Sequence, residues 1–118
     1  MALPELVRKT AEKLCDGLCQ RLNNDPSQDR LFGYKVEEAI FTLYARSGHC
    51  QQMLTIPVAR FSYIAELGQW SLQHSDDEHS WRPYLNAGPT LNLGQLIVHV
   101  EQDPYGFFRP PPVDPDHA

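Results

Sequence analysis

The residue types best suited to chemistry gather in one short polar segment, residues 74–79, with the sequence HSDDEH. Two imidazoles, His74 and His79, flank a run of carboxylates that includes Asp76. Imidazole and carboxylate bind zinc, and two histidines with one carboxylate form the facial triad that holds non-haem iron. The spacing matches no known metal motif, however, and no third well-placed ligand follows. We therefore favour a solvated acidic turn between two strands, with a metal site at these three residues as the alternative.

The cysteines form a second group, because Cys15 and Cys19 lie one helical turn apart and Cys50 follows His49. These four residues have the chemistry of a zinc site, and a thiolate at Cys50 could act as a nucleophile. The helical pair lies among leucines, however, and free cysteine is among the residues most often buried. Three cysteines in a chain without an export signal also favour reduced thiols. We interpret Cys15 and Cys19 as buried thiols.

Arginines and aromatic residues form the third group. Arg60 and Arg82 could bind one carboxylate or phosphate between them, which would make a small anion-binding patch on a sheet. The alternative, which we favour, is that these arginines pair with acidic neighbours while the nearby aromatic rings fill the core. Trp81 and Tyr84 flank Pro83 on a short segment, and proline in a strand favours an edge position, where burial is lower.

Motifs of the common enzyme classes do not occur in the sequence. It has no phosphate-binding glycine loop, no nucleophile elbow and no CxxC motif. Adjacent carboxylates, such as Glu37 and Glu38, are more typical of a solvated surface than of acid–base catalysis. We therefore expect no cofactor and lean against an enzyme.

The elements that must position these residues follow from hydrophobic periodicity. Apolar residues at spacings of three and four predict an amphipathic helix over residues 3–23, and a second helix from Leu91 or Leu93 to Gln102. Between them the period changes to two, which predicts strands near residues 32–36, 39–46, 53–65, 69–74 and 80–84. Pro57 marks an edge, a bulge or a break in the third of these strands.

This order predicts a single α+β domain over residues 1–108. The domain consists of an N-terminal helix, a four- or five-stranded antiparallel meander and a C-terminal helix. The last segment, residues 109–118, is rich in proline and polar residues, so we expect an extended or disordered tail.

Charge and hydropathy limit the partners. The 118-residue chain has 15 acidic and 10 basic residues, a net charge of −5, and most of its basic residues are scattered singly. Nucleic-acid and anionic membrane surfaces favour basic patches, so neither is an expected partner. No apolar run approaches the ~20 residues that cross a bilayer, and the N-terminus lacks the pattern of a signal peptide. We expect a cytoplasmic protein.

The second half of the chain carries a spaced pattern of aromatic, arginine and glycine residues. Its members are residues 59–63 (ARFSY), Gly68, Trp70, Leu72, Trp81, Arg82, Tyr84, Asp103, Pro104, Gly106 and Phe108. Over about residues 57–108 this pattern resembles a family of small bacterial proteins that consist of a domain of unknown function. The resemblance implies an architecture and no chemistry. The acidic turn before Trp81 and the Arg109 that follows Phe108 depart from the pattern, which has a basic turn and a glycine there.

These observations favour a non-enzymatic module that binds another protein, or itself as a homodimer. The expected binding surface is an exposed edge strand with Trp81, Arg82 and Tyr84, assisted by Arg60, because Trp, Tyr and Arg dominate interface hot spots and an open edge can recruit a strand. One alternative is a metal-dependent or small-ligand enzyme with its site at residues 74–79. The other is a small-anion-binding module that uses Arg60 and Arg82.

Overall fold

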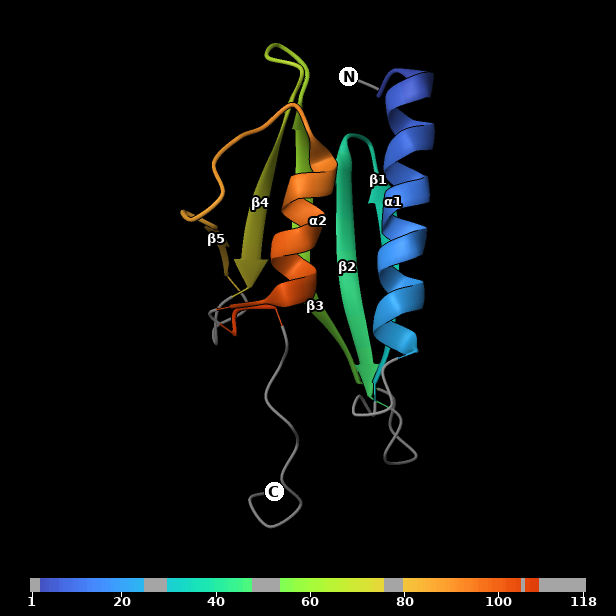
Figure 1. The fold of residues 1–118 in the computed structure, drawn as a ribbon. Coiled ribbons are helices and arrows are strands. Elements are labelled where there is room, and N and C mark those ends of the chain that lie inside the picture. The colour runs from blue at the N-terminus through green and yellow to red at the C-terminus, as the bar shows by residue number, and fades with distance from the viewer. Residues whose placement is uncertain (1–2, 25–29, 48–53, 76–79, 105, 109–118) are drawn as a thin grey trace.

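The computed structural model describes residues 3–24, 30–47, 54–75, 80–104 and 106–108. Its elements, in chain order, are α1 (Glu5–Asn23), β1 (Arg30–Glu37), β2 (Ile40–Ser47), β3 (Leu54–Ile64), β4 (Gln69–Ser75), β5 (Trp81–Pro83) and α2 (Leu93–Gln102) (Figure 1). The strands form one antiparallel sheet in the order β1-β2-β3-β4-β5. The predicted α+β meander is therefore confirmed, with five strands. The predicted tail, residues 109–118, lies outside the described residues.

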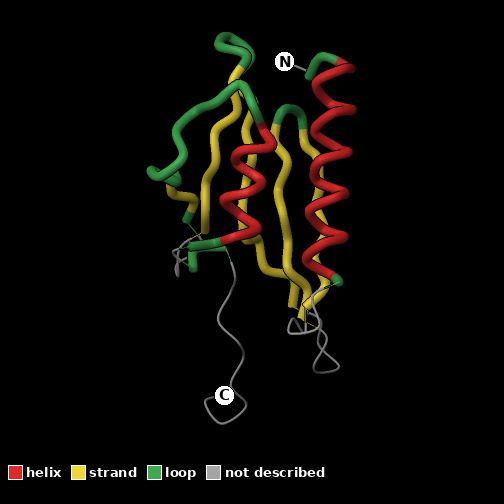
Figure 2. The backbone as a smooth tube through the Cα atoms, in the orientation of Figure 1, coloured by secondary structure: helices red, strands yellow, loops and turns green. Residues whose placement is uncertain are grey.

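The molecule has two layers, because both helices lie on the same face of the sheet (Figures 1 and 2). α1 packs against β1 and against α2, while α2 also packs against β4. The core lies between the layers, where Phe41, Phe61 and Leu18 are fully buried. No described helix is long and apolar enough to cross a membrane.

α1 forms because its apolar residues share one face. Five of them are buried, at spacings that bring them onto one side of the helix: Ala11, Cys15, Leu18, Cys19 and Leu22. Pro4 precedes the first helical residue, where its missing N–H costs nothing. At the other end, Arg21 Nε lies 2.9 Å from Glu101 Oε1 of α2, so an ion pair joins the first helix to the last.

The alternation of side chains assigns each strand residue to one face of the sheet. Phe41 of β2 lies opposite Phe61 of β3, and both are buried under the helices. β2 and β3 change register at Leu43 and Tyr44, because Val58 is an extra residue on β3. This β-bulge directly follows Pro57, the position at which the sequence predicts an edge, a bulge or a break.

The chain after α2 turns back onto the sheet. Asp103 ends the helix in the left-handed conformation, with φ 43°, and its Oδ1 accepts a hydrogen bond from the Phe108 N–H at 3.2 Å. This turn returns Phe108 to the core, where it is 1% exposed. Residues that follow α2 therefore complete the same core that α1 begins.

Candidate functional site

The sheet face opposite the helices, which we call the open face, carries the outward side chains of the strands. Because Phe32 and Phe41 point into the core, the alternation directs their neighbours outward. On β1 these are Leu31, Gly33 and Lys35, and on β2 they include Tyr44 and Arg46. No described helix covers this face (Figure 1).

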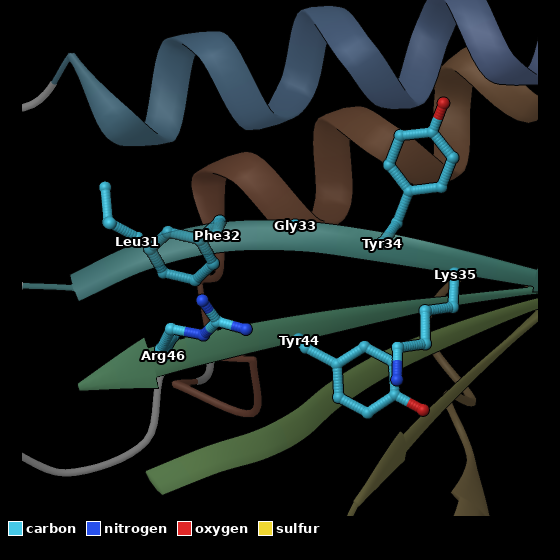
Figure 3. A pocket seen from close by; sticks show the side chains of 7 residues that line it. All are labelled: Leu31, Phe32, Gly33, Tyr34, Lys35, Tyr44 and Arg46. Carbon is cyan, nitrogen blue, oxygen red and sulfur yellow. The ribbon is translucent and has the colours of Figure 1, made fainter. Parts of the chain in front are cut away.

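Residues of β1 and β2 line a hollow of about 390 Å³ (Figure 3). Besides outward residues of both strands, Phe32 and Tyr34 of β1 contribute to its lining. Gly33 is among its lining residues, lies opposite Tyr44 in the sheet, and lacks a Cβ, which leaves open space there. Lys35 Nζ lies 5.5 Å from the centroid of the Tyr44 ring, and Arg46 also lines the hollow. The hollow therefore combines two cations with an aromatic ring and the exposed Leu31, a set that suits a ligand with a carboxylate beside an apolar group.

The charge of the open face has the opposite sign to that of the chain. Lys35, Arg46 and Arg60 point outward from the first three strands, and Glu37 is the acidic residue that the described parts of the strands add to this face. The chain as a whole carries −5. Such an asymmetry favours an acidic partner on this face.

The β5 end of the open face carries a second cluster. The Arg60 guanidinium carbon lies 4.6 Å from the centroid of the Trp81 ring, and Arg60 Nε donates a hydrogen bond to Gln73 Oε1 at 2.8 Å. Ser75 lies opposite Trp81 on the neighbouring strand, which places Trp81 on the face of Gln73. β5 is an end strand of the sheet, as predicted, and two of the predicted binding residues are in contact there.

The pairing of Arg60 with Arg82 in one anion site is wrong. Arg60 lies opposite Gln73, whereas Arg82 lies opposite His74. Adjacent residues on β4 point to opposite faces, so the two arginines lie on opposite faces of the sheet. Arg82 is therefore on the helix side and does not share a pocket with Arg60.

The expectation that Tyr84 lies on an exposed edge is also wrong, because Tyr84 is 2% exposed. Its N–H donates to the Leu72 carbonyl at 2.9 Å, and its ring lies 5.1 Å from the Phe108 ring. The Tyr84 hydroxyl lies 3.4 Å from His99 Nδ1 of α2. The returning segment at Phe108 covers the tyrosine, and nothing near residue 84 in the sequence indicates that contact.

The candidate metal ligands are not brought together in the described part of the chain. The His74 ring stacks on Phe107 with 4.4 Å between centroids, on the helix side of the sheet. Asp76 and His79 lie outside the described residues. Among the residues that are described, no group of three or more potential ligands forms a metal site.

The helical cysteines are buried, as predicted. Burial raises the pKa of Cys15 to about 12 and that of Cys19 to about 11, because a thiolate loses its hydration in the core. Since the thiolate is the nucleophile and the metal ligand, protonated thiols at these positions are inert. The other members of the proposed cysteine group, His49 and Cys50, lie outside the described residues.

A second hollow, of about 430 Å³, lies on the helix side between the first half of α1, the β3–β4 turn and the start of α2. Leu6 and Leu91 line it and are 79% and 73% exposed. None of its lining residues is charged, so it offers no electrostatic basis for choosing an occupant. The open-face hollow does offer one.

A comparison with known protein families covers every described helix and strand. The model of a family described as a domain of unknown function, DUF3024, matches residues 3–110. The chain belongs to the DUF3024 family. The resemblance at residues 57–108 covers the second half of the chain. The family match also includes α1 and the first strands, so it spans both helices and all five strands. No match was found among the curated proteins or the solved structures. The description of DUF3024 assigns no function, so the function must be argued from the open face.

Proposed function

We propose that this DUF3024 chain is a non-enzymatic interaction module that binds another protein through the open face of its sheet. The observation that carries the proposal is the charge reversal on that face. Lys35, Arg46 and Arg60 point outward there in a chain of net charge −5. The partner surface is therefore acidic.

Two clusters on the open face have the composition of interface anchors. Trp, Tyr and Arg are the residues that most often dominate binding energy. The Arg60–Trp81 contact supplies one such pair at the β5 end, and Tyr44 beside Lys35 supplies another at the β1–β2 end. Both aromatic side chains are half-buried, so their rings are supported by the sheet while part of each faces solvent.

Binding is favoured over catalysis because the reactive groups that are described lie in the helix-side layer. Cys15 and Cys19 are buried thiols, and His74 and His99 contact aromatic rings. Free thiols also suit the reducing cytoplasm, which is the location we propose.

The test is quantitative capture of proteins from a bacterial lysate on the immobilised full chain. Arg46→Ala and Arg60→Ala each remove one open-face cation. Arg8→Ala removes a cation from the exposed ion pair with Glu12 on α1 and serves as the matched control. We expect a protein that the wild type and the Arg8 variant recover equally. The open-face variants should recover several-fold less of it, and added salt should weaken its binding.

Two results would contradict the proposal. One is a partner recovered equally by all four chains, which would place binding on another surface. The other is a wild-type chain that recovers no protein above a blank resin. Circular dichroism and thermal unfolding of each variant establish that it is folded before capture is compared.

A further inference from the structure

β1 is the other end strand of the sheet. Asn23, the last residue of α1, forms hydrogen bonds to the backbone of one residue on the outer edge of this strand. The Phe32 N–H donates to Asn23 Oδ1 at 2.7 Å, and Asn23 Nδ2 donates to the Phe32 carbonyl at 3.1 Å. The side-chain amide of Asn23 thus bonds to Phe32 as a neighbouring strand would. Both backbone groups of Phe32 therefore point away from β2.

The antiparallel pattern also gives the direction of the backbone groups of Tyr34 and Val36. In such a ladder, residues alternate between bonding to one neighbour and bonding to the other. Because the backbone groups of Phe32 point away from β2, the N–H and C=O groups of Tyr34 and Val36 also point away from β2. Within the described ranges, no group pairs with these four backbone atoms. β1 therefore offers an edge of two residues that begins directly after the Asn23 contact.

We infer that this edge binds an extended peptide segment of a partner protein as a sixth, antiparallel strand, and this inference rests on the proposed interaction function. Main-chain bonds to Tyr34 and Val36 give such strand addition its affinity, and side-chain contacts give it its specificity. The Asn23 contact ends the free edge at Phe32, which fixes where the added strand can lie.

The charges beside the edge specify the segment. Lys35 and Glu37 of β1 both lie on the open face, two residues apart. In an antiparallel added strand the residue opposite Glu37 comes first and is basic, and the residue opposite Lys35 comes two positions later and is acidic. The residues opposite Val36 and Tyr34 lie beside half-buried side chains and are apolar. Read from its N-terminus, the segment is basic, apolar, acidic, apolar.

A second copy of this chain satisfies this edge less well than a different protein does. When two β1 strands pair antiparallel about Lys35, the free backbone groups of Tyr34 and Val36 are all used, but one lysine lies opposite the other. Pairing about Val36 places Lys35 opposite Glu37, yet leaves Tyr34 opposite the turn residue Glu38, which has φ 54°. Neither register combines all four main-chain bonds with paired charges. A different chain can provide both.

The test begins with selection of a random eight-residue peptide display library on the folded full chain and, in parallel, on its Lys35→Glu variant. The wild type should select the basic, apolar, acidic, apolar order. The variant should select a basic residue at the third position. With the strongest peptide made synthetically, exchange of its acidic residue for lysine should weaken binding about ten-fold. N-methylation of its two apolar residues should abolish binding, because it removes the N–H donors that pair with the edge.

Amide hydrogen exchange of the full chain locates the peptide. The amides of Tyr34 and Val36 should exchange more slowly with peptide bound. The Phe32 amide, which already donates to Asn23, is the internal control and should not change. Three results would each overturn the inference. These are selected peptides that protect neither amide, peptide binding that survives N-methylation, and a library that yields no binder. A chain that dimerises through this edge would overturn it too.

Lysate capture by a Val36→Pro variant separates this inference from the proposed function. Proline at an outward edge position removes one free N–H without touching the β1–β2 ladder. If the partner is lost with the open-face arginine variants but retained by Val36→Pro, the interaction module stands and the added strand is wrong. If only Val36→Pro loses it, the edge stands and the open-face proposal is wrong. The N-methylated peptide gives the same answer with an unaltered protein.

Discussion

Asn23 contributes to stability through both ends of its amide. Its Oδ1 accepts from the Phe32 N–H and its Nδ2 donates to the Phe32 carbonyl, so one side chain satisfies two backbone groups at a sheet edge. Aspartate has nearly the same shape but can only accept when it is ionised. The position therefore distinguishes hydrogen-bond chemistry from size.

Asn23→Asp should lower the free energy of unfolding by about 1–2 kcal/mol, because a carboxylate oxygen then faces the Phe32 carbonyl without a donor between them. Urea denaturation at neutral pH measures the change. Asn24→Asp, at the next residue, is the matched control, because the Asn24 side chain is exposed and the substitution adds the same charge. Equal losses for the two variants would show that charge, and not the hydrogen bond, is responsible.

The buried thiols predict how stability depends on pH. A cysteine thiol in water has an ordinary pKa of 9.0, and burial raises the pKa of Cys15 to about 12 and that of Cys19 to about 11 in the folded chain. Their stabilising contribution is complete below pH 9, where both the folded and the unfolded chain keep the protons. It is lost as pH rises through 9 to 12, because the unfolded chain releases its thiol protons first.

At pH 10 each thiol should lower the free energy of unfolding by about 1 kcal/mol relative to pH 7.5. Urea denaturation at the two pH values measures this under reducing conditions. The Cys15→Ala variant is less stable at both, but its pH-dependent loss should be smaller than that of the wild type. A pH dependence that is identical in the two chains would show that other groups cause it.

At the scale of the elements, β1 carries a glycine where a strand ordinarily carries a side chain. Gly33 weakens the strand, because glycine loses more backbone freedom on folding than other residues. A Cβ built at Gly33 meets nothing within 4 Å, so packing does not require the glycine. Its effect is instead to leave room beside Tyr44 in the open-face hollow.

Gly33→Val should therefore raise the free energy of unfolding by about 0.5–1 kcal/mol and at the same time fill the hollow. If the hollow takes a partner side chain, lysate capture should fall although the fold is more stable. Thermal unfolding and capture are measured on the same preparation. A stabilised variant with unchanged capture would remove the hollow from the interface and leave the Arg60–Trp81 cluster as its anchor.

The elements follow from the sequence wherever local periodicity decides them. Leucine spacing predicts a helix over residues 3–23, which the structure has at Glu5–Asn23, and the period of two predicts all five strands. The position of Tyr84 could not be predicted, because Phe108 covers it from a turn that lies beyond α2. The exposure of a residue next to a short edge strand depends on such distant contacts.

The sequence indicates which residues face the open-face hollow, but not that they lie together. Alternation around Phe32 and Phe41 indicates that Lys35, Tyr44 and Arg46 point away from the core. That these three share a hollow depends on the pairing of Gly33 with Tyr44, which periodicity within one strand does not give. The opposite faces of Arg60 and Arg82 likewise follow only from the register of β3, β4 and β5.

For the whole molecule, the returning segment after α2 predicts where the domain ends. Phe108 is 1% exposed and is held by Asp103, so a chain that stops at residue 108 keeps every described core residue. We propose residues 1–108 as the complete folding unit.

A chain truncated after residue 108 should unfold at the same urea midpoint as the full chain. A chain truncated after residue 103 loses Phe108, uncovers Tyr84 and should be less stable by about 3 kcal/mol. Urea denaturation of the three lengths measures both effects. A lower midpoint for the 108-residue chain would show that residues 109–118 contribute to the fold.

The packing of α1 against α2 joins the first element of the chain to the last. During synthesis α1 leaves the ribosome before any strand exists to cover its buried face, and its partner α2 is translated after the entire sheet. The strand β1, which also packs against α1, is made soon after it, whereas the contact of α1 with α2 can form only after all five strands. The helix layer is therefore completed only when α2 has been translated, after the sheet on which both helices lie.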